Sequence, residues 1–160
     1  MATEAPRVIR PARPGDAQSI AGLLAELGYP DAVANVRDRL EHLGARNDAG
    51  VVVAELGGQV AGLAAYQCTD LLERAQPRCR ITTLVVHAEA RRHGLASALL
   101  SRIESIARAS GCFQLEVTTQ AHRRDAASLY QALGFHERPR RLVKPLVSGT
   151  SSPHPGSHDA

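Results

Sequence analysis

The stretch of sequence that decides the fold runs Leu84-Val85-Val86-His87-Ala88-Glu89-Ala90-Arg91-Arg92-His93-Gly94-Leu95-Ala96-Ser97. It begins with apolar residues typical of a buried strand, passes through a basic turn, and continues into apolar residues at helical spacing. The first turn of a helix carries backbone N–H groups without internal partners and the positive end of the helix dipole. A strand, a turn and a helix start in this order predict a phosphate site.

The residues at the turn fit that interpretation. Gly94 lets the backbone approach a ligand closely or adopt a positive φ. Ala96 is small enough for a phosphate to reach the helix start, and Arg91 and Arg92 add positive charge. The spacing is neither GxxxxGK[ST] nor GxGxxG, so the two best-known nucleotide loops are excluded. From the residues alone, an ordinary connection with a glycine bend stays an open alternative.

Working outward, the flanking sequence alternates between strand and helix patterns. Upstream we expect a strand over 7–12, a helix from an Asp16 N-cap to Gly28, a helix from an Asp31 cap to Gly44, and strands over 51–56 and 59–68 joined by Gly57-Gly58. Downstream we expect a strand over 81–86, a helix over 95–110, a strand over 113–119, a helix over 125–133 and one or two strands within 135–146. This alternation predicts an α/β or α+β fold, a mixed sheet with helices on both faces.

Length and composition favour one globular domain. The chain has 160 residues, which we divide into a domain over 1–147 and a tail over 148–160. The tail is rich in Ser, Pro, Gly and His, so we expect it to be disordered. Aromatic residues make up 3% of the chain and Trp is absent, which argues against a stacking platform for single-stranded nucleic acid. The net charge of +3 is compatible with an anionic ligand but does not identify one.

The cysteines and the apolar runs bear on compartment and metal binding. Cys68, Cys79 and Cys112 are widely spaced and form no zinc motif, so we expect free buried thiols in a reducing cytosol and no metal site. There is no signal-peptide pattern and no apolar run of about 20 residues, the length that a membrane span requires. We therefore expect a soluble, cytoplasmic protein that binds no membrane.

Three segments resemble one enzyme family. Arg91 to Ala96 resembles the [Arg/Gln]-x-x-Gly-x-[Gly/Ala] signature of GNAT-superfamily acetyltransferases, Ala126 to Phe135 resembles that family's A-x-x-L-Y-x-x-x-G-F ending, and Ile9 to Ala17 is similar to its usual opening. The resemblance covers residues 7–146 and implies a mixed, mostly antiparallel central sheet. Within the family, Thr118 to Ala126 resembles the branch that contains aminoalkylphosphonate N-acetyltransferases.

The resemblance implies acetyl-CoA as co-substrate, with its pantetheine arm on the strand backbone and its pyrophosphate on the loop. The residues that it places against acetyl-CoA are Leu84, Val85, Val86, Arg91, Arg92, His93, Gly94, Leu95, Ala96, Ser97 and Arg123. Arg123 stands where many members have an asparagine. Tyr130 matches the tyrosine that protonates the leaving thiolate, and its ordinary pKa of about 10 suits that transfer.

The sequence does not identify the group that accepts the proton of the amine. The segment Arg80 to Thr83 carries no carboxylate where several family members keep a general base. His87 and Glu116 are the nearest candidates, and a chain of water molecules would also serve. No metal is required for this chemistry.

The implied function is an N-acetyltransferase that moves an acetyl group to a primary amine, with a small molecule favoured, by direct attack in a ternary complex. By analogy with the family, the backbone N–H of Val86 would polarise the thioester carbonyl. The alternative is a non-catalytic acetyl-CoA-binding or protein-interaction module. A nucleic-acid binder is a weaker rival, because a solvated edge explains Arg138, Arg140 and Arg141 better. We expect no nucleic-acid partner, and the resemblance allows a homodimer.

Overall fold

A computed structural model describes residues 3–118, 124–138 and 141–148 of the chain. The chain forms two compact units, Met1–Thr118 and Thr119–Ala160, each of which is described by itself. Arg123, Arg140 and the predicted tail beyond Ser148 lie outside the described residues. The division into a domain over 1–147 and a tail therefore stays a prediction.

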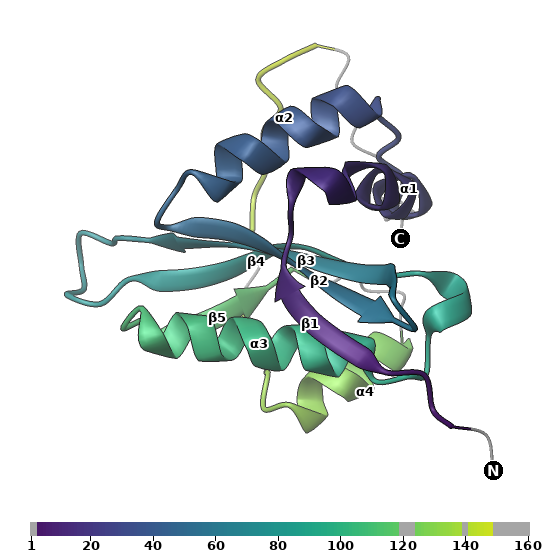
Figure 1. The fold of residues 1–160 in the computed structure, drawn as a ribbon. Coiled ribbons are helices and arrows are strands. Elements are labelled where there is room, and N and C mark those ends of the chain that lie inside the picture. The colour runs from purple at the N-terminus through teal and green to yellow at the C-terminus, as the bar shows by residue number, and fades with distance from the viewer. Residues whose placement is uncertain (1–2, 119–123, 139–140, 149–160) are drawn as a thin grey trace, which may run out of the picture. The chain divides into compact units, whose positions relative to one another are not determined.

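The first unit is built on a five-stranded sheet (Figure 1). Its strands are β1 (Arg7–Pro11), β2 (Ala49–Leu56), β3 (Gln59–Thr69), β4 (Arg78–Val86) and β5 (Gln114–Val117), and they lie side by side in that order. The pairs from β1 to β4 are antiparallel, whereas β5 runs parallel to β4. This arrangement confirms the predicted mixed, mostly antiparallel sheet.

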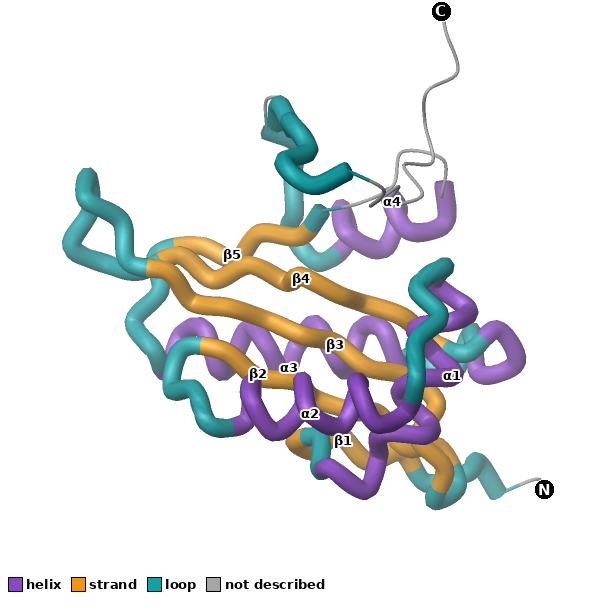
Figure 2. Tube along the Cα trace, turned by 90° about the horizontal axis from the view of Figure 1, so that it is seen from above, coloured by secondary structure: helices purple, strands orange, loops and turns teal. Residues whose placement is uncertain are grey.

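Helices cover both faces of the sheet, as the alternating pattern predicts (Figures 1 and 2). The short helix η1 (Pro14–Asp16), α1 (Ala17–Leu27) and α2 (Val33–Gly44) lie on one side, and α3 (Leu95–Ala109) lies on the other. A second short helix, η2 (Ala88–Ala90), lies between β4 and α3.

Each face has its own apolar layer. The layer under α1 and α2 includes Ile20, Leu23, Val36, Val53, Leu63 and Val85. The α3 layer is anchored by Leu95, Leu99, Leu100 and Ile103, all at most 2% exposed. Burial of each such side chain contributes roughly 1.5–3 kcal/mol to folding. The helical spacing of Leu95, Leu99 and Ile103 was sufficient to predict this buried face.

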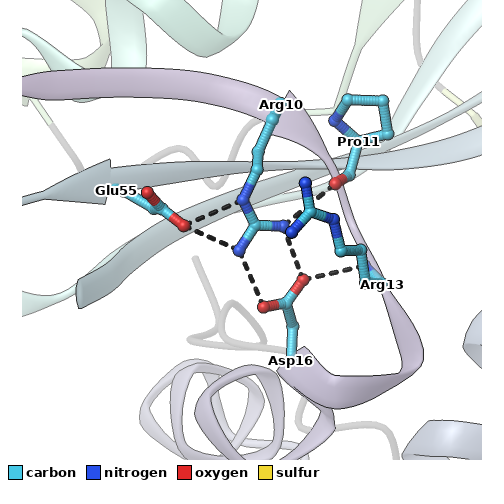
Figure 3. A network of polar contacts seen from close by, with 5 residues as sticks. All are labelled: Arg10, Pro11, Arg13, Asp16 and Glu55. Atoms are coloured by element: carbon cyan, nitrogen blue, oxygen red, sulfur yellow. Dashed lines mark hydrogen bonds and ion pairs between the residues drawn. The ribbon is translucent and has the colours of Figure 1, made fainter. Parts of the chain in front are cut away.

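Arg10 connects three elements at the edge of the first unit (Figure 3). Its guanidinium donates from Nε to Glu55 Oε1 at 2.8 Å and from Nη1 and Nη2 to the Asp16 carboxylate at 2.8 and 2.9 Å. Asp16 also accepts from the backbone N–H of Arg13 at 2.7 Å. Asp16 thus occupies the predicted N-cap position of α1 without capping it, because its oxygens are engaged by Arg10 and η1.

The hydrogen bonds from Arg10 lower the pKa of Asp16 below its ordinary value, against the opposing effect of burial. Side-chain exposure is only 16% for Arg10 and 12% for Asp16, so solvent screens this ion pair weakly. The start of α2 also differs from expectation. Asp31 lies one residue before the N-cap Ala32 and accepts from Ala32 N at 2.7 Å and Asn35 Nδ2 at 2.8 Å.

The second unit contains α4 (Arg124–Ala132), in agreement with the predicted short helix. The strands predicted within 135–146 are absent from the described parts of that segment, 135–138 and 141–146. Pro139 and Pro145 lack the backbone N–H that a strand ladder uses, which accounts for the difference.

The three cysteines are free thiols, as predicted, although only Cys79 is buried. Cys68 and Cys112 are partly exposed, and their sulfurs lie 3.6 Å apart. Burial raises the pKa of the Cys112 thiol to about 11, with a further contribution from its hydrogen bond to Cys68. Within the described residues, no helix combines the length and the apolar character that crossing a membrane would require.

Candidate active site

The candidate site begins where β4 extends beyond its neighbour. β4 pairs with β5 only from Arg78 to Ile81, opposite Gln114 to Val117, where β5 ends. β4 then continues to Val86 beside β3 alone. Among the described residues of the first unit, no strand pairs with the other edge of this second half of β4.

The backbone of this second half presents hydrogen-bonding groups at the open edge. His87 N donates to Ala61 O at 2.7 Å, which makes these two residues a hydrogen-bonded pair of the β3–β4 ladder. Antiparallel ladders alternate, so the next such pair is Leu63 with Val85. The N–H and C=O groups of Leu84 and Val86 therefore point away from β3, toward the open edge. An extended ligand that contains amides can pair there as an added strand would.

A bulge in β4 sets the direction of its side chains. The register with β3 shifts between Ala65 and Tyr66, so that Thr82 has no opposite residue. Beyond the bulge, Val85 packs in the layer under α1 and α2. Val86 instead faces α3, and its Cγ2 would lie 3.3 Å from a Cβ placed on Gly62. Such bulges re-aim side chains and interrupt pairing, which is what happens at this edge.

The loop between η2 and α3 alternates in backbone conformation. Arg91 is extended, Arg92 has φ 69° and Gly94 has φ 71°. Positive φ is uncommon for arginine, and a non-glycine residue held in this region is frequent at ligand sites. Turns with left-handed residues bring successive backbone N–H groups to one side, where they form a concavity for an anion.

The N-terminus of α3 has backbone N–H groups that make no hydrogen bond within the helix. Gly94 is the N-cap and has no side chain with which to cap the helix. The first hydrogen bond of the helix runs from Ala98 N to Gly94 O, at 3.1 Å. The N–H groups of Leu95, Ala96 and Ser97 precede it and have no partner within the helix. Ala96 and Ser97 are half-buried, whereas the side chain of Leu95 is fixed in the core. These residues fit a pyrophosphate through their backbone.

Arg7 of β1 supports this loop, a feature that sequence reasoning missed. Its Nη1 donates to His93 O at 3.0 Å. A Cβ placed on Gly94 would lie 2.7 Å from the same nitrogen, so Arg7 packs directly against the glycine. Arg91, Arg92 and His93 have exposed side chains. Because Arg7 and His93 are 86 residues apart, no local pattern could reveal the contact.

His87 lies directly after β4 and is turned toward α1. Its Nδ1 accepts from Glu89 N at 3.2 Å and lies 3.6 Å from Glu26 Oε1. A neutral imidazole that accepts at Nδ1 carries its proton on Nε2, so His87 must give up the Glu89 bond before it can take another proton at Nδ1.

Glu116 of β5 is engaged by basic side chains. Arg80 donates to its Oε2 from Nε at 3.1 Å and from Nη2 at 2.9 Å, and Gln114 donates to Oε1 at 2.7 Å. Partial burial by itself raises the pKa of Glu116, but the Arg80 hydrogen bonds, with the charges of Arg78 and Arg80, bring it below the ordinary value. A carboxylate stabilised in this way is a weak proton acceptor.

Tyr130 belongs to α4 in the second unit. Its ring meets Phe135 edge-on, with centroids 5.6 Å apart and an interplanar angle of 78°. Phe135 N also donates to Tyr130 O at 2.9 Å, which closes the helix end. The role of Tyr130 toward the thioester stays a prediction, as does that of Arg123. In the described parts of the chain, no group of three or more His, Cys, Asp or Glu residues is arranged to hold a metal ion.

Comparisons with known proteins agree with this geometry. The profile of the acetyltransferase (GNAT) family matches residues 20–135. A transcriptional regulator from Bacillus halodurans C-125 has a TM-score of 0.80 at 23% identity, with 88% of this chain and 99% of that chain covered. Aminoglycoside N-acetyltransferase AAC(6')-Iy in complex with CoA has a TM-score of 0.78 at 18% identity, with 91% and 97% covered. A GNAT family acetyltransferase from Staphylococcus aureus subsp. aureus USA300_TCH1516 has a TM-score of 0.74 at 19% identity, with 88% and 98% covered.

At these identities the solved structures show a shared fold. No curated protein sequence matches the chain significantly. The profile match spans more than half of the chain and thus carries the family assignment.

Proposed function

Because the chain belongs to the acetyltransferase (GNAT) family, we propose that it transfers the acetyl group of acetyl-CoA to the primary amine of a small molecule by direct attack in a ternary complex. Membership of this family makes the protein an acyltransferase and acetyl-CoA its co-substrate. One observation supports the proposal most: the open edge of β4 is followed, after η2 and the loop over 91–94, by a helix start without a side-chain cap. These two features offer backbone donors to an amide-containing arm and to a pyrophosphate.

The residues of the first unit divide the binding between them. Leu84 and Val86 present backbone groups to the pantetheine arm, and the backbone from Arg92 to Ser97 faces the pyrophosphate. The N–H of Val86 is the donor that we assign to the thioester carbonyl. Bound acetyl-CoA supplies the activated acetyl group. The protein contributes mainly by holding the two reactants in line.

The proton of the amine leaves, in this proposal, through water. Glu116 accepts hydrogen bonds from Arg80, and Nδ1 of His87 accepts one from the backbone N–H of Glu89. The acceptor atoms of both side chains are therefore engaged within the fold. Tyr130 is the residue that we assign to protonation of the leaving thiolate, on the strength of its match to the family motif.

The finer parts of the proposal concern the acceptor class, the cellular location and the oligomeric state. The segment Thr118 to Ala126 supports a place near the aminoalkylphosphonate N-acetyltransferases. Two of the similar solved structures are aminoglycoside acetyltransferases, which supports a small-molecule acceptor of some kind. We propose a cytoplasmic location, which the use of acetyl-CoA as co-substrate supports. A homodimer stays a prediction from the resemblance, and light scattering on the purified chain would test it.

Acetyl transfer to a panel of small amines, followed by thiol release and by mass spectrometry of the products, tests the proposal. We expect steady turnover with at least one amine. We further expect Tyr130→Phe to lower kcat by roughly one to three decades, the size of a general-acid effect, with unchanged CoA affinity. CoA binding without turnover on any amine would favour the alternative, a non-catalytic acetyl-CoA-binding or protein-interaction module.

A further inference from the structure

Three cysteines from three separate segments of the first unit lie together where β4 begins. Cys68 is near the end of β3, Cys79 lies directly opposite it in β4, and Cys112 follows α3. Cys112 Sγ donates a hydrogen bond to Cys68 Sγ at 3.6 Å, across a sequence separation of 44 residues. Figure 1 shows the C-terminal end of α3 and the connection between β3 and β4 at the same end of the unit. A disulfide bond is about 2.05 Å long, so these two sulfurs have to approach by about 1.5 Å to form one.

Hydrogen bonds fix the backbone on both sides of this thiol pair. Cys68 N donates to Asp48 O, next to β2, at 2.6 Å. Cys112 N donates to Ala107 O, in the last turn of α3, at 3.0 Å. The main chain at each cysteine is thus anchored to a neighbouring element, and the approach of the two sulfurs falls to their side chains.

Burial separates the three thiols. Cys79 is 0% exposed, whereas Cys68 and Cys112 are partly exposed. Cys68 also lines a depression of about 290 Å³ at the surface, together with polar residues that include Asn47, Gln67 and Ser110. A small reagent therefore has access to Cys68 from solvent, while Cys79 is shielded by the fold.

The neighbouring thiols direct their protons toward Cys68. Burial raises the pKa of Cys112 to about 11, and its hydrogen bond to Cys68 contributes to the shift. The pKa of Cys79 is raised as well, first by burial and then by its interaction with Cys68. Both neighbours therefore keep their protons at neutral pH. An S–H group that donates a hydrogen bond stabilises negative charge on the accepting sulfur, and the thiolate is the reactive form of cysteine.

We propose that Cys68 and Cys112 are a thiol–disulfide exchange site for small-molecule disulfides, and that the product is a reversible Cys68–Cys112 cross-link. First, the Cys68 thiolate attacks one sulfur of the reagent. The S–S bond of the reagent breaks, one half leaves as a thiolate, and the other half stays on Cys68. Cys112 then gives its proton to solvent, attacks the Cys68 sulfur and expels the second half. The two protein thiols are oxidised, and the reagent is reduced to two thiols that take up the two protons.

The cross-link ties the end of β3 to the segment after α3. It closes a long loop, because its two cysteines are 44 residues apart, and it stabilises the chain by restricting the unfolded state. Its position is far from the proposed donor site. Seven residues of β4 separate Cys79 from Val86, which is about 23 Å at a rise of about 3.3 Å per residue. The cross-link should therefore change stability without changing CoA affinity.

The test on the wild-type chain uses bis(2-hydroxyethyl) disulfide, a neutral reagent. We expect the intact mass of the reduced full chain to fall by two hydrogens after treatment. A tryptic digest without reductant should then link the peptide that contains Cys68 to the peptide that contains Cys112, and dithiothreitol should reverse the reaction. The melting temperature of the oxidised chain should be higher by roughly 5–15 °C, with CoA affinity within twofold of that of the reduced chain.

Variants assign the order of the steps. Cys112→Ser should stop the reaction at the mixed disulfide, so that the chain gains the mass of one half of the reagent on Cys68. Cys68→Ser should slow modification of the chain by about tenfold or more, because the remaining thiols are protonated at neutral pH. Cys79→Ala is the matched control, since it removes a thiol of the same cluster and should leave the Cys68–Cys112 product unchanged.

A wild-type chain that links Cys68 to Cys79, or that stops at the mixed disulfide, would overturn the inference. Equal rates of modification in Cys68→Ser and Cys112→Ser would also contradict it, because Cys68 would then not be the first nucleophile. These measurements need no acetyl transfer, so their outcome is independent of the proposed function.

Discussion

The Arg10 cluster and the Arg78–Arg80 cluster are built from the same residue types in opposite proportions. At Arg10 one guanidinium meets two carboxylates, Asp16 and Glu55, and its donors are bonded inside the fold. At the start of β4 two guanidiniums meet the carboxylate of Glu116, and within the described residues the buried Nε of Arg78 has no hydrogen bond.

The same contrast holds for the backbone. Around β1 and η1 the polar groups are satisfied within the chain, for example by the bond from Arg13 N to Asp16. Along the second half of β4 and at the start of α3, backbone donors face an edge that no strand of the described residues pairs with and a helix end without a side-chain cap. Satisfied groups stabilise the fold, whereas unsatisfied groups are available to a ligand. Changes in the two regions should therefore have separable effects.

The largest effect is expected at Gly94. Gly94→Glu should weaken CoA binding in calorimetry by roughly a hundredfold or more, since it places a negative charge where the pyrophosphate is proposed to bind. Strain adds to this effect, because φ is 71° there and a Cβ would lie 2.7 Å from Arg7. Gly111→Ala is the matched control, with φ 73° and no atom within 4 Å of the added Cβ. Unchanged affinity in Gly94→Glu would remove the loop from the site.

A change in the Arg10 cluster should act on stability alone. We expect Asp16→Asn to lower the free energy of unfolding by about 1–3 kcal/mol, since it removes a charged acceptor of three hydrogen bonds in a poorly exposed site. CoA affinity should stay within twofold of wild type. Urea titration measures the loss, and Asp38→Asn on the exposed face of α2 is the control. A stable variant with impaired CoA binding would contradict the division between the two regions.

The same pair predicts a dependence of stability on pH. The pKa of Asp16 is lower in the folded chain than in the unfolded chain, where it is about 3.9. Its contribution is therefore present above about pH 4 and is lost as the pH falls through the lower, folded-state pKa. Wild type and Asp16→Asn should approach each other in stability below pH 4. A difference that persists in acid would show that Asp16 acts through packing rather than through charge.

A smaller effect is expected at Arg7, which links the two regions because it lies on β1 and bonds the loop. Arg7→Ala should weaken CoA binding roughly threefold to tenfold, since one exposed hydrogen bond to His93 O is lost. Arg37→Ala on α2 is the control for the loss of one exposed positive charge. If Arg7 acts by positioning Gly94, the combined loss in Arg7→Ala with Gly94→Ala will be less than additive. If the losses of CoA affinity in the two single variants add up to the loss in the double variant, Arg7 acts only through its positive charge.

The smallest effects are expected at the two candidate bases. His87→Ala and Glu116→Gln should each reduce kcat for a neutral amine by no more than a few-fold, because a water relay does not depend on either. The pH profile of kcat/KM should then follow the ionisation of the amine. A loss of a hundredfold or more in either variant, with CoA affinity retained, would identify that residue as the base.

The sequence by itself determined most of the elements and their order, and it predicted a donor site at the loop before α3. Apolar residues at positions 95, 99 and 103 predicted the buried face of α3, and the basic glycine loop before it predicted an anion site, because both signals are local. The strands predicted after Phe135 did not appear in the described residues, where Pro145 lacks the backbone N–H that a strand ladder uses.

Only the tertiary structure decided what depends on contacts between distant segments. The bulge at Thr82 and the early end of β5 arise from strand register, which no local pattern specifies. The contact of Arg7 with His93 and the grouping of Arg78 and Arg80 around Glu116 are likewise long-range. The sequence suggested Glu116 as a base because this residue is a carboxylate within a predicted strand. Its neighbours across the sheet, which govern its charge and its pKa, are brought together only by the fold.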